Sequence, residues 1–134
     1  MYKESDRLTF LYYAFVCARK KLDSGKMTRE RFEELEEAVR NNTAPSVHLL
    51  EHCFPKAFEE SLSFRTAAEY WHQHKGSSDP CSVRTATICS INDDGSVTVL
   101  CGNKTFEVWN RYKLPLDGVV SVFIHWDTIT EVEF

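Results

Sequence analysis

The chain has 134 residues, of which 43% are hydrophobic and 13% aromatic, and its formal net charge is -4 at pH 7. This length suits one domain, or two small units sharing a core. The apolar content is enough for the chain to fold without disulfide bonds or structural metal ions. Residues 1–75 contain 12 basic residues (Lys or Arg) and 12 acidic residues (Asp or Glu), whereas residues 76–134 contain 4 basic and 8 acidic residues. Because a nucleic-acid surface needs a basic stripe, the composition argues against a nucleic-acid partner.

The longest apolar run, around residues 8–18, is interrupted by Thr9 and framed by charged residues. It is too short and too amphipathic to span a bilayer. The N-terminus lacks the basic-then-apolar order of a signal peptide. The five cysteines form no C-x-x-C pair and therefore indicate neither a disulfide framework nor a zinc ribbon. We expect a cytoplasmic protein without membrane association.

The first half, residues 1–75, is predicted to form three or four helices. Apolar residues recur on one helical face over residues 5–22, Ser24-Gly25 is a stop signal, and Thr28 caps a second helix to about residue 39. A short helix over residues 46–53 follows. Pro55 then suits the first turn of a fourth helix, which is expected to reach about residue 75.

Beyond a linker at residues 76–80, the apolar period changes to two. Strands are predicted over residues 83–91, 96–101, 104–109, 119–126 and 128–134. The segments Asn92–Gly95 and Gly102-Asn103 are typical of hairpin turns. Five short strands without a helix to cover a flat sheet favour a closed barrel. The predicted fold class is α+β, with N-terminal helices packed on a small five-stranded antiparallel β-barrel over residues 80–134.

Residues 48–52 read His48-Leu-Leu-Glu-His52, which matches the H-x-x-E-H pattern of inverted zinc proteases. In that pattern two histidines one helical turn apart bind the metal and the glutamate acts as the base. A simpler interpretation is that both histidines lie at the edge of a short helix, with Glu51 in water. A zinc hydrolase using His48, Glu51 and His52 is one alternative for the function.

Three stretches of the second half carry a family resemblance. The layout of this half is similar to that of small hydrogenase-maturation chaperones of the HypC/HupF type. The similarity is carried by Cys81-Ser-Val-Arg-Thr-Ala-Thr-Ile88, residues 90–99 and Lys104-Thr-Phe-Glu-Val108. The ending Gly118-Val-Val-Ser-Val-Phe-Ile-His125 resembles that family's Gly-x-x-Val-x-Val-His segment. With Trp126-Asp127 it also resembles an uncharacterised prokaryotic family that has a helical part before a similar barrel.

The chaperone resemblance implies a site at Cys81 and His125, because the matching residues of that family together hold an iron centre during its delivery. A thiolate and an imidazole suit a borderline metal, here iron or zinc. His52 and Cys53 are candidates for extra ligands if the helices cover the barrel mouth. The predicted function is a non-enzymatic accessory or binding protein whose helical half contacts a protein partner. The other alternative is an interaction module or inhibitor without a metal site.

Overall fold

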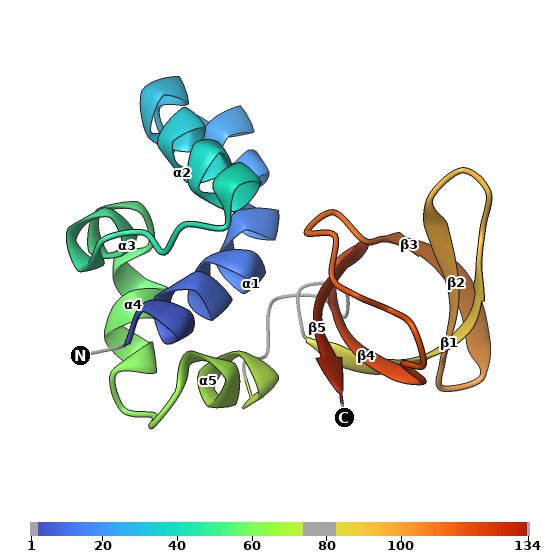
Figure 1. The fold of residues 1–134 in the computed structure, drawn as a ribbon. Coiled ribbons are helices and arrows are strands. Elements are labelled where there is room, and N and C mark those ends of the chain that lie inside the picture. Colours follow the sequence, from blue (N-terminus) through green and yellow to red (C-terminus); the bar gives the residue numbers. More distant parts are fainter. Residues whose placement is uncertain (1–2, 74–82, 134) are drawn as a thin grey trace. The chain divides into compact units, whose positions relative to one another are not determined.

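The computed structural model describes residues 3–73 and 83–133, and the chain divides into two compact units, Met1–Gln73 and His74–Phe134. The described part of the first unit is helical and that of the second is a five-stranded sheet (Figure 1). The predicted α+β class, with helices first and strands second, is confirmed. Among the described helices, none has both the length and the apolar character that crossing a membrane requires.

The helical unit contains five helices within residues 3–73. They are α1 (Glu4–Asp23), α2 (Arg29–Asn41), α3 (Val47–Cys53), α4 (Pro55–Ser61) and α5 (Ala67–Gln73). The Thr28 hydroxyl caps α2 by accepting the backbone N–H of Arg31 at 3.2 Å. The Ser46 hydroxyl caps α3 in the same way, accepting the N–H of Leu49 at 3.1 Å. The predicted cap at Thr28 is therefore confirmed.

The single helix predicted from Pro55 to about residue 75 is wrong, because the described chain forms two helices with a break at residues 62–66. At the end of α4, the Ser61 hydroxyl donates to the Phe58 carbonyl at 2.6 Å. At the start of α5, the Thr66 hydroxyl accepts the N–H of Glu69 at 3.1 Å. Threonine followed three residues later by glutamate is the pattern of a capping box, which starts a new helix.

The core of the helical unit is built around α1, which packs against both α2 and α5. Phe10 is fully buried there. Its ring meets those of Phe54, Phe58 and Trp71 edge to face, at centroid distances of 6.1, 5.9 and 5.5 Å. Such aromatic contacts add to the free energy gained by burying apolar surface. Phe10 thus ties α1 to the later helices.

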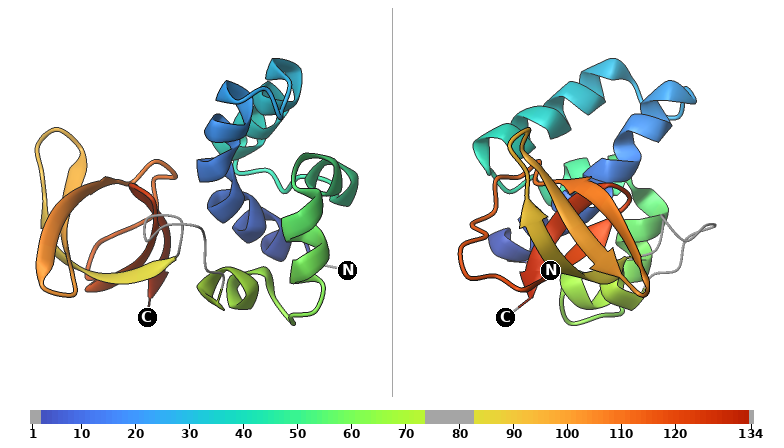
Figure 2. Two further views of the ribbon diagram at one scale, coloured as in Figure 1. Left: turned by 180° about the vertical axis from the view of Figure 1, so that it is seen from behind. Right: turned by 90° about the vertical axis from the view of Figure 1, so that its right-hand side faces the viewer.

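The second unit is a closed barrel with the strand order β1-β2-β3-β5-β4 (Figure 2). Its strands are β1 (Arg84–Ile91), β2 (Ser96–Cys101), β3 (Lys104–Trp109), β4 (Ser121–His125) and β5 (Thr128–Glu133). The pairing of β1 with β4 completes the ring. One apolar cluster comprises Ala86, Val97, Val99, Val108, Val122, Ile124 and Ile129.

The predicted antiparallel sheet is corrected to a mixed one. Four of the strand pairs are antiparallel, but β3 and β5 run parallel, with Trp109 opposite Thr128. The backbone N–H of Trp109 donates to the Asp127 carbonyl at 2.7 Å beside this pair. The reason is geometric: strand direction cannot alternate at every pair around a closed ring of five strands, so one pair must be parallel.

Replacing Phe10 with alanine is expected to lower the free energy of unfolding by about 3–5 kcal/mol, because it leaves a cavity among three rings. Urea unfolding followed by the helical circular dichroism signal measures this. Leu62→Ala in the same unit is the control, since Leu62 is 47% exposed, and it is expected to cost less than about 1 kcal/mol. Equal losses in the two variants would contradict the assignment of Phe10 to the core.

The Asp94 carboxylate gives the β1–β2 turn a dependence on pH. It accepts the Ser96 hydroxyl at 2.6 Å and the Ser96 N–H at 2.9 Å, and these hydrogen bonds lower the pKa of Asp94 from its ordinary value of 3.8. A carboxyl whose pKa is lowered by folding stabilises the protein above its unfolded pKa, and this contribution disappears as the pH falls through the folded pKa.

Asp94→Asn is therefore expected to lower the unfolding temperature at pH 7, and the difference from wild type should vanish as the pH falls below 3.8. Thermal unfolding over a pH series measures both effects. Asp93→Asn removes the same charge from an exposed residue of the same turn and should change stability little. A difference for Asp94→Asn that persists unchanged into acid would show that the carboxylate hydrogen bonds do not cause it.

Candidate functional site

Four strand ends meet around His125 at one end of the barrel. In the β1–β4 ladder Arg84 pairs with Ile124, and in the β4–β5 ladder His125 pairs with Thr128. Thr128 also lies opposite Trp109, the last residue of β3. The start of β1, the ends of β3 and β4, and the start of β5 therefore lie together, and we call this region the His125 end of the barrel.

The His125 side chain is fully buried, with 0% of its surface exposed. Burial restricts the ring to a defined orientation, as a ligand or a structural hydrogen-bonding group requires. Cys81, the predicted partner of His125 in a metal site, lies outside the described residues. The structure therefore gives the surroundings of one member of this pair.

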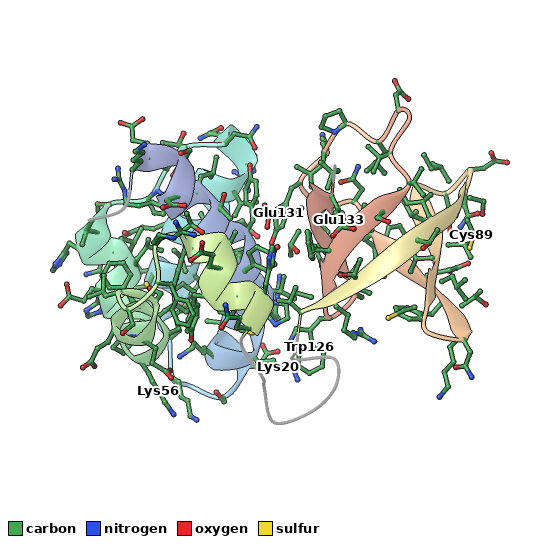
Figure 3. The ribbon with its side chains drawn as sticks, turned by 90° about the horizontal axis from the view of Figure 1, so that it is seen from below. Lys20, Lys56, Cys89, Trp126, Glu131 and Glu133 are labelled. Carbon is green, nitrogen blue, oxygen red and sulfur yellow. The ribbon has the colours of Figure 1, made fainter. Side chains whose placement is uncertain are left out.

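An arginine fixes the turn that follows His125. Arg111 bonds the Asp127 carboxylate at 2.8 Å through its terminal nitrogen and donates from Nε to the Thr128 hydroxyl at 3.0 Å. Trp126, labelled in Figure 3, takes a left-handed backbone conformation with φ of 56° between β4 and β5. Sequence reasoning missed Arg111, because it is 16 residues from Asp127 and the two meet only when the barrel closes.

A small pocket of about 100 Å³ lies in the helical unit, where the loop before α2 meets the end of α3. Met27 and Cys53 are its buried lining residues. The other residues that line it are Lys26, Thr28, Arg31 and His52. The sequence neighbours His52 and Cys53, which were predicted as extra ligands of the barrel site, both line this pocket. Lys26 and Arg31 lie beside them, and like charges there disfavour a metal cation and favour an anionic group.

The Cys53 thiol is not activated as a nucleophile. Burial raises its pKa above the ordinary value of 9.0, and Glu34 raises it further, while the positive charges of Arg31 and Lys21 act in the opposite direction. The thiol without a bound metal is therefore protonated at neutral pH, whereas nucleophilic attack needs the thiolate. The pocket therefore offers two positively charged side chains, Lys26 and Arg31, and a protonated thiol, which suit binding of an anionic group.

His48, Glu51 and His52 are all exposed residues of the seven-residue helix α3. The two imidazole rings face each other with centroids 6.3 Å apart and planes 28° apart. Catalytic zinc sites use three protein ligands and one open position. Over residues 3–73 and 83–133, no three His, Cys, Asp or Glu side chains gather closely enough to hold a metal ion.

The basic residues of the pocket belong to a longer basic segment that the sequence analysis passed over. Two acidic residues lie in this segment, Asp23 and Glu30. The basic residues between positions 19 and 31 are Arg19, Lys20, Lys21, Lys26, Arg29 and Arg31. This local excess is hidden by the balanced count for residues 1–75, because many acidic residues of that half follow the segment, at Glu33, Glu34, Glu36 and Glu37.

The chain matches no protein-family model, no curated protein and no solved structure. The resemblance of the barrel half to the HypC/HupF-type chaperones therefore stays a prediction from the residues that carry it.

Cysteine alkylation tests the assigned thiol environments. Cys89 on β1 is exposed (Figure 3), whereas Cys53 is buried and its pKa is raised. Brief iodoacetamide treatment at pH 7 is expected to modify Cys89 first and Cys53 last among the described cysteines. Peptide mapping by mass spectrometry measures the order, and the two rates should become similar in urea. Rapid modification of Cys53 in the folded protein would contradict its burial.

Proposed function

We propose that the protein is a non-enzymatic accessory or binding protein of the small-barrel chaperone kind. In this proposal Cys81 and His125 hold a metal ion or a metal-bearing intermediate, and the helical half contacts a partner protein. The supporting observation is the β1–β4 register. Arg84 pairs with Ile124, the neighbour of His125, and Cys81 precedes Arg84 by three residues in the sequence.

The donor set fits the proposed group. A cysteine thiolate and a neutral imidazole bind zinc and iron, and two protein ligands leave positions open for other groups on the metal. Such open positions suit a protein that carries a metal and passes it on. The burial of His125 favours a fixed ring orientation, which reduces the entropy lost when the metal binds.

The helical half offers a basic surface for the protein partner. The pocket is lined by Lys26 and Arg31 and by the buried residues Met27 and Cys53. Arg31 also bonds Glu34 at 3.2 Å, so part of its charge is already compensated. An acidic segment of a partner would complement this surface.

The same pocket favours the second candidate function, an interaction module or inhibitor without a metal site. That candidate needs only the helical surface and leaves the barrel as a scaffold. The two candidates differ in one property, the metal content of the protein. The zinc-hydrolase alternative would need His48 and His52 as ligands with Glu51 as base, and it predicts loss of metal in His48→Ala with no effect of Cys81→Ser.

Metal content distinguishes these functions. The protein is purified anaerobically without a histidine tag, and bound metal is counted by mass spectrometry for wild type, Cys81→Ser and His125→Gln. We expect a stoichiometric metal at the barrel in wild type and the loss of that one equivalent in both variants, because each removes a ligand of the barrel site. Cys89→Ser is the matched control, since it makes the same chemical change at an exposed position of β1.

His125 is buried, so the unfolding temperature of His125→Gln is measured beside its metal content. Loss of metal from a variant that still unfolds cooperatively supports the ligand role. Metal content that is the same in wild type, Cys81→Ser and His125→Gln, even after anaerobic reconstitution, contradicts the barrel site and leaves the interaction module as the better function.

A further inference from the structure

His48 and His52 form a second candidate metal site, on the exposed face of α3. Residues four apart on a helix lie one above the other on the same face, and both side chains are exposed. Their rings are stacked near each other, with centroids 6.3 Å apart and planes inclined by 28°. Zinc enzymes use this spacing of two histidines on one helix to hold their ion.

The backbone of α3, which carries the two histidines, is fixed by hydrogen bonds at both ends and by buried residues on its opposite face. The Ser46 hydroxyl caps the start of α3 at 3.1 Å, and the N–H of Phe54 donates to the Leu50 carbonyl at 2.8 Å at its end. Leu50 and Cys53 anchor the opposite face in the core. The helix is therefore fixed independently of the exposed rings, and binding needs only side-chain rotation.

We propose that His48 and His52 together bind a zinc ion at the surface of the helical unit, through one nitrogen of each ring. Bonds of about 2.0–2.1 Å from nitrogen to zinc require one nitrogen of each ring to turn toward the same point, because the lone pairs lie in the ring planes. Rotation about the side-chain bonds of two exposed residues supplies this movement. The remaining positions of a tetrahedral ion are filled by water or by donors from another molecule.

The charges around the pair limit the affinity. Glu51 is exposed on the same helix, and its carboxylate attracts a cation to this face. On the other side, His52 also lines the pocket that contains Lys26 and Arg31, and these positive charges oppose a cation. His48 is not among the residues that line this pocket. The ion is therefore expected on the His48 side of the His52 ring.

This zinc site is independent of the proposed barrel site at Cys81 and His125, and the experiment separates them. Zinc is titrated by calorimetry into metal-free protein carrying Cys81→Ser, which removes the barrel thiolate. Imidazole proton and nitrogen NMR signals identify the rings that respond. A second ring on the same helix acts at high effective concentration, so removing either ring is expected to weaken zinc binding roughly 100-fold.

The variants are His48→Ala, His52→Ala and, as a matched control, His72→Ala, which removes an exposed histidine from α5 of the same unit. The proposal expects matching losses for His48→Ala and His52→Ala, zinc-dependent shifts of both ring signals, and unchanged affinity for His72→Ala. It is overturned if the Cys81→Ser protein does not bind zinc, if either of the first two variants binds as tightly as its parent, or if His72→Ala loses as much affinity. Failure of this zinc site leaves the barrel site to its own metal measurement.

Discussion

The pairing of β1 with β4 is the constraint on which the barrel depends. It joins the first strand of the sheet to the fourth and so closes the order β1-β2-β3-β5-β4 into a ring. Closure shortens the strand edge that is open to another chain, because β3 and β5 meet only at Trp109 and Thr128. It also brings the start of β1 beside the end of β4, where His125 lies, and so creates the His125 end of the barrel.

Closure also explains why the pair β3–β5, which has the shortest ladder of the sheet, runs parallel. With five strands in the ring, one neighbouring pair has to run parallel, and here it is β3 with β5. A single pair, Trp109 with Thr128, forms this contact, and the Trp109 N–H bonds the Asp127 carbonyl. Arg111 holds the adjoining turn through Asp127 and Thr128. Asp127 and Thr128, which take part in the contacts between β3 and β5, follow His125 closely in the chain. The geometry of the candidate site therefore depends on how the barrel closes.

Sequence reasoning located most elements because their signals are local. The alternation of β-branched and aromatic residues gave the bounds of β2 and β3, and the hydroxyl of Thr28 marked the start of α2. The break between α4 and α5 was missed, although Thr66 and Glu69 form a local capping pattern, because the apolar spacing continued through it. The parallel β3–β5 pair follows from the odd number of strands in a closed barrel, which is incompatible with the predicted wholly antiparallel sheet.

The candidate sites were harder to predict because their neighbours come from distant parts of the chain. His52 and Cys53 were singled out as extra metal ligands, but their chemistry is changed by Lys26 and Arg31, which reach the same pocket from the loop before α2 and from α2 itself. The pair His48 and His52 needed only helical spacing, and the facing rings follow from it. Cys81 lies outside the described residues, so its pairing with His125 stays a prediction from the family resemblance, supported by the β1–β4 register.

The most direct test of this account is the distance between the Cys81 Sγ atom and the nearer ring nitrogen of His125 in a crystal structure of anaerobically purified protein. Two donors that share one ion through bonds of roughly 2.0–2.3 Å lie within about 5 Å of each other. A shared site requires a separation below that limit, with or without the metal. A longer separation in a well-ordered barrel would contradict a shared site and would assign His125 a structural role.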